Sequence, residues 1–414
     1  MIAEILVTGQ EILTGSVIDT NSAHIAQTLE EAGLEVTRHV CVGDDMEIIV
    51  SIIKEISKRA DVAVVTGGLG PTADDITAEA AAKSADVELV LNRSALRAVE
   101  DYFKERKRTM TSSNKKQAML PKGSEYLYNP VGTAPGFSMK IGRCSFFFIP
   151  GVPFEVFRML SDIVIPRIEK HQSRAREVNL VKTISTFGLG ESAIGEQLAG
   201  LTAEFPEIKL GIRAKFPEIH VTLYCRGKDD KGLDQSMGKA SEWVMKKIGE
   251  KVFSDDGDSM EAVVGGLLAG KKATLAVAES CTGGLISHWL TNVPGSSEYF
   301  LYSGVTYSNE SKSKLLGVST KILERHGAVH EETVKEMAEG VRRVAGSNYG
   351  LSTSGIAGPA GGTKDKPVGT VCIGLATPHS VKGFRFFFPF NSRSRNKKIF
   401  AMKALDLLRH ELQG

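Results

Sequence analysis

The sequence predicts an α/β protein of three successive domains, the first of which is a doubly wound, mostly parallel sheet. The length of 414 residues is long for one domain and fits two to four. Residues 1–170 alternate strand-like and helix-like segments, a pattern typical of a parallel sheet with helices on both faces. The pattern changes in residues 171–250, and a further alternating unit follows in residues 251–414. We therefore expect a small α/β linker domain between two larger α/β domains.

The composition is that of an ordinary globular protein and excludes several functional classes. Hydrophobic residues make up 42% and charged residues 24% of the chain. The net charge of +2 lacks the basic signature of a dedicated nucleic-acid binder. No run approaches the roughly 18 apolar residues that cross a bilayer, and no signal peptide precedes the first strand. Five scattered cysteines without a C-x-x-C pair argue against a disulfide framework or a zinc site. We expect a cytoplasmic protein with no membrane partner.

The elements of the N-terminal domain can be read in order from the spacing of apolar residues. Strand-like runs alternate with two segments of helical spacing, and the order is residues 4–8, 21–32, 36–42, 47–59 and 62–65. The second helix should place Ile48, Ile52 and Ile56 on its buried face. Ligands of such sheets bind beyond the carboxyl ends of the strands, so the strand ends are the candidate site.

Two kinds of side chain gather at these strand ends. Thr66, Gly67 and Gly68 form a loop that suits a phosphate or pyrophosphate. Asp74 and Asp75 come shortly afterwards, and clustered carboxylates beside a phosphate loop are what a cation such as Mg²⁺ requires. Equally well, the two aspartates could favour the N-terminal dipole of a helix beginning near residue 76.

The run from Thr66 to Thr77 resembles the molybdopterin-binding-like domain at the N-terminus of the CinA (competence/damage-inducible protein A) family. Residues 129–137 and 149–155 extend the resemblance. It implies a metal-dependent ADP-ribose pyrophosphatase that uses a divalent metal such as Mg²⁺, rather than molybdenum cofactor synthesis. Gln10 stands where the family often has an aspartate, which removes one charge. The implied metal ligands are Glu11, Asp44 and Asp75, and the implied substrate-binding residues are Thr66, Gly67, Gly68, Asn129 and Gly132.

The middle segment resembles the KH-like α/β module that links the two halves of CinA proteins. Its expected elements are strands at residues 181–187 and 220–225 and helices at residues 191–201 and 233–248. KH domains hold nucleic acid with a G-x-x-G loop between helices, and this segment has no such loop in that position. We favour a structural spacer over a nucleic-acid site.

In the C-terminal domain, a strand-like run at residues 275–278 passes into a helix that begins beyond Gly284. Ser280, at the junction, is either a helix cap or a nucleophile. N–H groups at the start of that helix would form an oxyanion hole if Ser280 attacks a carbonyl. Cys281 could be taken for a catalytic thiol, but no histidine stands nearby in a suitable motif, so we interpret it as a small packing residue.

Two further stretches supply what a serine nucleophile needs. Residues 302–312 begin as a strand and end in a polar turn with Tyr307 and Lys312, and a desolvated lysine can serve as the base. Residues 353–363 are an apolar run broken by a glycine-rich loop of the kind that cradles phosphate. Without further context, Lys312 would be a solvated lysine, and Arg393 part of a basic surface with Arg395 and two lysines.

Together these stretches resemble the nicotinamide-nucleotide amidase domain of the CinA family, and the resemblance continues through residues 366–370. It implies that Ser280 attacks the amide, Lys312 takes its proton and Tyr307 orients the network or relays the proton. No metal is implied for this half. Ala360 replaces a usual glycine and Lys397 a common arginine. The implied substrate-binding residues are Thr282, Gly283, Gly284, Gly355, Gly358, Gly361, Gly362, Thr363 and Arg393.

The resemblance as a whole implies a bifunctional enzyme of pyridine-nucleotide salvage. Its C-terminal domain (residues 251–414) would convert nicotinamide mononucleotide to nicotinate mononucleotide and ammonia, and its N-terminal domain (residues 1–170) would cleave ADP-ribose. The linker domain is expected at residues 171–250. The alternative is a non-catalytic nucleotide- or pterin-binding protein associated with competence. We expect a homodimer that acts on small-molecule nucleotides and does not bind nucleic acid.

Overall fold

The computed structural model describes residues 1–171, 178–227 and 230–414. Its internal contacts divide the chain into two compact units. The first holds Met1–Leu180 and Cys225–Asp234, and the second holds Val181–Tyr224 and Gln235–Gly414. The predicted boundary at residue 170 lies next to residues 172–177, which are outside the described residues.

The first unit is built on a six-stranded sheet, and its topology confirms the doubly wound, mostly parallel prediction. The sheet order is β2-β1-β3-β8-β7-β6. The first three pairings are parallel and the last two are antiparallel. Its strands are β1 (Ile2–Thr8), β2 (Glu35–Val42), β3 (Val62–Thr66), β6 (Glu125–Leu127), β7 (Gly136–Ile141) and β8 (Cys144–Ile149). A separate antiparallel pair joins β4 (Leu89–Leu91) and β5 (Met119–Pro121).

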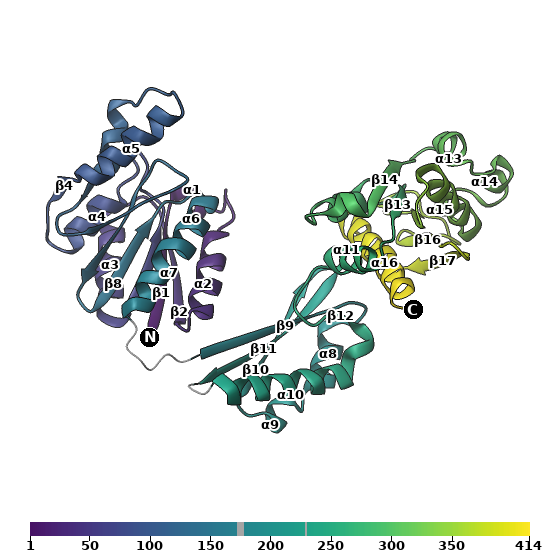
Figure 1. Cartoon of the computed structure of the whole chain (residues 1–414), viewed down its shortest axis with the longest axis horizontal. Coiled ribbons are helices and arrows are strands. Elements are labelled where there is room, and N and C mark those ends of the chain that lie inside the picture. The colour runs from purple at the N-terminus through teal and green to yellow at the C-terminus, as the bar shows by residue number, and fades with distance from the viewer. Residues whose placement is uncertain (172–177, 228–229) are drawn as a thin grey trace. The chain divides into compact units, whose positions relative to one another are not determined.

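Helices cover both faces of this sheet, and each face has its own hydrophobic core (Figure 1). Ile53 and Ala80 pack with Phe148 on one face, and Ile25 and Val156 pack with Phe147 on the other. The helical segments are α1 (Gln10–Leu13), α2 (Asn21–Glu31), α3 (Met46–Arg59), α4 (Thr77–Ser84), α5 (Arg93–Glu105), a 3₁₀ segment (Ser112–Ala118), α6 (Pro153–Met159), a π segment (Leu160–Val164) and α7 (Ile165–His171).

The predicted buried face of α3 is partly wrong. Ile49, Ile53 and Ile56 are fully buried, whereas Ile48 is 50% exposed. Six isoleucines and valines crowd this helix, so two overlapping sets satisfy helical spacing and the sequence alone does not distinguish them.

The middle of the chain forms a four-stranded sheet in the order β10-β11-β9-β12, with α10 alongside it (Figure 1). The predicted helix at 191–201 ends early and is followed by a second short helix. The sequence did not predict strand β10, because only one of its eight residues is buried and the rest show no clean alternation. The elements are β9 (Val178–Thr186), α8 (Glu191–Leu198), α9 (Leu201–Glu204), β10 (Ile208–Lys215), β11 (Glu218–Gly227), α10 (Asp230–Ile248), a 3₁₀ segment (Gly249–Lys251) and β12 (Val252–Ser254).

The C-terminal domain has a five-stranded sheet in the order β14-β13-β15-β16-β17. Helices α11, α12 and α16 pack on one core and α13, α14 and α15 on the other. The strands are β13 (Leu275–Glu279), β14 (Phe300–Val305), β15 (Tyr349–Gly355), β16 (Thr370–Ala376) and β17 (Val381–Phe387). The helical segments are α11 (Met260–Gly270), α12 (Leu285–Thr291), a 3₁₀ segment (Ser296–Glu298), α13 (Asn309–Leu316), α14 (Thr320–His326), α15 (Glu331–Ala345) and α16 (Arg393–Gln413).

The position of β13 in this sheet defines where a site can form. It lies between β14 and β15 and is parallel to both, so Glu279 is level with Val305 and Thr353. Carboxyl ends of parallel strands meet at one edge, so the residues after β13 and β14 come together there. Within the described part of the chain, no helix has both the length and the apolarity to cross a bilayer.

Candidate active site

Ser280 and Lys312 meet at this edge of the C-terminal sheet. The Nζ atom of Lys312 lies 3.2 Å from the Oγ atom of Ser280. Ser280 follows β13 directly, and its N–H donates to the carbonyl of Thr353 at 3.0 Å. Its hydroxyl caps no helix, because the N-cap position of α12 belongs to Gly284. The helix-cap interpretation of Ser280 is therefore wrong.

Lys312 is fully buried, not solvated. It lies in the first half of α13, in a stretch that was predicted as a polar turn, and Ser308 caps that helix. Its Nζ also donates to the carbonyls of Thr306 at 2.9 Å and Tyr307 at 3.1 Å. In the described residues no carboxylate forms an ion pair with it. Desolvation therefore lowers the pKa of Lys312, and the neutral amine is the form that can accept a proton.

The first amides of α12 are not available as an oxyanion hole. The carboxylate of Glu279 accepts hydrogen bonds from the N–H groups of Gly284, Ile286 and Ser287 at 2.9, 3.2 and 2.9 Å. The expectation that helix-start N–H groups would bind an oxyanion is therefore wrong. Nothing in the sequence pattern separated Glu279 from the other strand-end acids.

The turn between Ser280 and α12 packs tightly against β15. The hydroxyl oxygens of Thr282 and Thr353 lie 2.7 Å apart in the buried interior. A Cβ atom added at Gly355 would lie 3.2 Å from the sulfur of Cys281. Cys281 is 5% exposed and burial raises its pKa to about 12, so its thiol stays protonated and packs in the core.

Lys312 donates its hydrogen bond to the backbone carbonyl of Tyr307 and not to the hydroxyl. Its side chain is 60% exposed, and its hydroxyl oxygen accepts a hydrogen bond from Arg393 at 3.0 Å. Arg393 also donates to the carbonyl of Gly358 at 2.8 Å. The guanidinium thus joins the end of β14 to the glycine-rich loop.

A cavity of about 460 Å³ lies at the start of α16, which begins at Arg393 because Ser392 caps it. The cavity has a cationic lining. A Cβ atom added at Gly283, where φ is +58°, would lie 3.3 Å from Nζ of Lys397, so this lysine reaches the turn after Ser280. Sequence reasoning treated these lysines as general basic surface. The lining residues are Leu285, Arg393, Ser394, Lys397 and Lys398.

The far end of the glycine-rich loop is not part of this cationic cavity. Gly361 and Gly362 do not line this cavity, and Thr363 forms a turn with Lys366 by accepting its N–H at 3.1 Å. No hydrogen bond among the described residues joins these three to Ser280 or Lys312.

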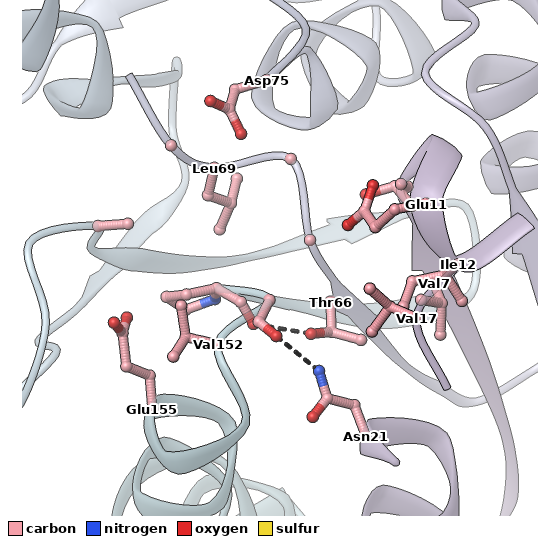
Figure 2. A pocket seen from close by; sticks show the side chains of 18 of the residues that line it. Val7, Glu11, Ile12, Val17, Asn21, Thr66, Leu69, Asp75, Val152 and Glu155 are labelled. Atoms are coloured by element: carbon pink, nitrogen blue, oxygen red, sulfur yellow. Dashed lines mark hydrogen bonds between the residues drawn. The ribbon is translucent and has the colours of Figure 1, made fainter. Parts of the chain in front are cut away.

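The N-terminal domain has its own cavity of about 530 Å³ at the carboxyl ends of β1, β3 and β8 (Figure 2). Thr66 donates to the carbonyl of Pro150 at 2.7 Å and Asn21 to that of Gly151 at 2.8 Å, so the loop after β8 is fixed as one wall. Several residues predicted for ligand or metal binding line it: Glu11, Asp44, Thr66, Gly67, Gly68 and Asp75.

The carboxylates in this cavity do not form a ready metal site. Asp44 accepts the N–H of Gln10 at 3.0 Å, and Asp75 accepts the N–H of Thr72 at 2.8 Å as well as its hydroxyl. Desolvation, together with the charges of Glu11, Asp74 and Asp75, raises the pKa of Asp44. Across the ranges that the structure describes, no three His, Cys, Asp or Glu side chains are close enough to share an ion. Mg²⁺ usually takes one or two carboxylates together with waters and substrate phosphates, so a metal at these side chains would need a bound nucleotide to complete its ligands, and we derive no step through one.

Asn129 and Gly132 do not line this cavity but a second one of about 310 Å³. Asn129 donates to the carbonyl of Ala134 at 2.9 Å and to the carboxyl of Glu155 at 2.7 Å. It also accepts the N–H of Gly132 at 2.9 Å. Glu155 does line the cavity and is 8% exposed, and burial raises its pKa. Sequence reasoning missed it.

Comparison with known proteins assigns all three domains. Family models match residues 4–170 (probable molybdopterin binding domain), 181–254 (damage-inducible protein CinA KH domain) and 257–412 (CinA C-terminal domain). A CinA-like protein of Desulfosudis oleivorans is 55% identical over 412 residues, which is 100% of both chains. A protein of Shewanella oneidensis named nicotinamide-nucleotide amidohydrolase PncC is 43% identical over 99% of this chain and 95% of its own.

These matches define the class: a molybdopterin-binding-like domain, a KH-like linker domain and a CinA C-terminal domain. The chain belongs to the CinA family, which confirms the resemblance and the fold class inferred from the sequence.

Proposed function

We propose that the C-terminal domain hydrolyses the carboxamide of nicotinamide mononucleotide to nicotinate mononucleotide and ammonia. The observation that carries the proposal is the buried Lys312, whose Nζ lies 3.2 Å from Ser280 Oγ with no carboxylate paired to it in the described residues. The name of the Shewanella oneidensis relative supports the substrate.

The proposed reaction proceeds through an acyl-enzyme. Neutral Lys312 takes the proton of Ser280 as Oγ bonds to the amide carbon, and the carbonyl oxygen becomes an oxyanion. The Lys312 ammonium then protonates the amide nitrogen, and ammonia leaves. Water attacks the resulting ester, Lys312 takes a proton from it, and that proton returns to Ser280 Oγ when the nicotinate nucleotide leaves.

The cationic cavity beside the turn accounts for recognition of the substrate's phosphate. Arg393, Lys397 and Lys398 line it, and Lys397 approaches Gly283. A phosphate is a strong acceptor for charge-assisted hydrogen bonds from such side chains. The phosphate in this proposal lies at the start of α16 and not in the loop at 361–363.

Ammonia release from nicotinamide mononucleotide tests the proposal, with nicotinamide riboside as the substrate that lacks the phosphate. Wild type should act on the nucleotide with chelator present, and Ser280→Ala should be inactive. Equal kcat/KM for the two substrates would contradict the assignment of the cationic cavity.

A second candidate function is metal-dependent cleavage of ADP-ribose in the N-terminal domain. The cavity of about 530 Å³ beside Thr66, Gly67 and Gly68 favours a nucleotide ligand. ADP-ribose hydrolysis measured with Mg²⁺ and with excess chelator, on wild type and Asp75→Ala, tests it. Activity in chelator would contradict metal dependence. Binding without cleavage would support the non-catalytic alternative.

The homodimer and the cytoplasmic location remain predictions. Light scattering of the full chain would test the homodimer.

A further inference from the structure

Glu279 is a fully buried acid directly before Ser280 in the chain. One carboxylate oxygen accepts the N–H groups of Gly284 and Ile286, and the other accepts the N–H and the hydroxyl of Ser287 at 2.9 and 2.5 Å. A buried carboxylate is costly unless its oxygens are saturated with donors. Here four donors converge on it, and three of them are amides at the positive end of a helix.

This arrangement caps α12 from the preceding strand. The N-cap residue Gly284 has no side chain to serve as a cap. Because Glu279 ends β13 and accepts the N–H groups of Gly284, Ile286 and Ser287, it fixes both ends of the turn that contains Ser280.

The same network reaches the segment that carries the base. The hydroxyl of Ser287 lies 2.5 Å from the hydroxyl of Ser303 on β14. That strand leads to Thr306 and Tyr307, whose carbonyls hold the Nζ of Lys312. Glu279 is therefore tied to both partners of the Ser280–Lys312 pair.

Saturation of Glu279 also determines which amides are left in the turn. The N–H groups of Cys281, Thr282 and Gly283 donate to no other residue in the described parts of the chain. They lie between the nucleophile and the capped helix, where a developing oxyanion needs donors.

We propose that Glu279 is a positioning residue of the amidase: its carboxylate fixes the turn after Ser280 so that the amides of residues 281–283, and not those of α12, stabilise the oxyanion. The inference rests on the proposed role of Ser280 but not on the identity of the substrate.

The test is the rate at which a serine-reactive fluorophosphonate labels Ser280 in the full chain, measured beside ammonia release. Glu279→Gln keeps the shape but turns one acceptor oxygen into a donor that faces backbone N–H groups. Loss of oxyanion stabilisation by a single donor costs about 10²–10³-fold in related sites, so we expect labelling and kcat to fall by about 10²-fold. KM should stay within about twofold, and the pH dependence set by Lys312 should not move.

Asp406→Asn is the matched control. Asp406 is also a buried carboxylate of this domain, and it accepts hydrogen bonds from Lys403 and Arg409 on α16, away from Ser280. The Asp406→Asn substitution should lower the melting temperature without slowing the labelling of Ser280. If Glu279→Gln does not fold, Ser287→Ala, which removes one donor and the link to Ser303, should give a labelling rate about 3- to 10-fold lower.

Labelling of Glu279→Gln at the wild-type rate would overturn the inference. An equal fall in the labelling rate of Glu279→Gln and Asp406→Asn, at equal melting temperatures, would also overturn it. For Ser287→Ala, an unchanged rate would do the same. If wild type is labelled at Ser280 but releases no ammonia, the proposed substrate is contradicted. The labelling rates of the variants then still test the role of Glu279. Wild type that is not labelled would overturn both.

Discussion

The guanidinium of Arg393 donates to the hydroxyl oxygen of Tyr307 at 3.0 Å and to the carbonyl of Gly358 at 2.8 Å. The Tyr307 ring is thereby held at the exposed rim of the site, while its carbonyl holds Lys312. Tyr307 thus binds Arg393 through its side-chain hydroxyl and Lys312 through its backbone carbonyl.

For Tyr307→Phe we expect a larger effect on KM than on kcat. The substitution removes the acceptor that holds Arg393, an arm of the cationic cavity, but leaves the carbonyl that holds Lys312. KM for nicotinamide mononucleotide should rise about 3- to 10-fold, the size of one hydrogen bond. A 100-fold fall in kcat with unchanged KM would instead support proton relay by the hydroxyl.

Lys312→Met should abolish turnover without unfolding the domain. Methionine fills much of the same volume, and no described carboxylate loses an ion-pair partner. We expect kcat to fall about 10³-fold or more because Ser280 loses its base. Lys314→Met, which removes an exposed charge from the same helix, is the control and should keep wild-type kcat.

The rate should rise with pH through the pKa of Lys312. Desolvation lowers that pKa from 10.5, and the neutral amine is the active form, so the midpoint should lie below that of an ordinary lysine. The same shift affects stability: the unfolded chain binds the proton more readily, so this group destabilises the fold below its folded pKa. The penalty disappears as pH rises toward 10.5. A rate that falls with pH over this window would contradict the role of a neutral lysine.

Lys397→Met should weaken selection for the phosphate. Lys397 lines the cationic cavity, so kcat/KM for nicotinamide mononucleotide should fall about 10-fold or more while that for nicotinamide riboside stays constant. Equal losses on both substrates would show that Lys397 acts on the turn at Gly283 and not on the phosphate.

Gly132→Ala should destabilise the N-terminal domain alone. A Cβ atom there would lie 2.2 Å from the carboxyl carbon of Glu155, which Asn129 holds in place. We expect a loss of about 1–3 kcal/mol, seen as an earlier thermal transition, with amidase activity unchanged. If Gly132→Ala unfolds at the same temperature as wild type, the Glu155 side chain can move aside, which would contradict this account.

The sequence predicted the first three strands of the N-terminal sheet and the strands of the C-terminal sheet, because apolar runs, turn glycines and helical spacing are local signals. It failed where two local patterns compete, as on α3, where Ile49 and not Ile48 faces the core. It also gave no strand in the stretch that holds β4 to β8, and it missed β10, where only one of the eight residues is buried.

The site was less accessible to sequence reasoning. Ser280 and Lys312 are 32 residues apart, and only the parallel pairing of β13 with β14 brings them together. The burial of Lys312 depends on carbonyls from the preceding loop, which a polar sequence does not reveal. Glu279 gave no signal because its four donors are mostly backbone groups.

Ammonia release from nicotinamide mononucleotide by wild type and Ser280→Ala, with chelator present throughout, tests the central claim most directly. A Ser280–Lys312 amidase predicts metal-independent release by wild type and none by the folded variant. Release that persists in Ser280→Ala would contradict the assignment of the nucleophile.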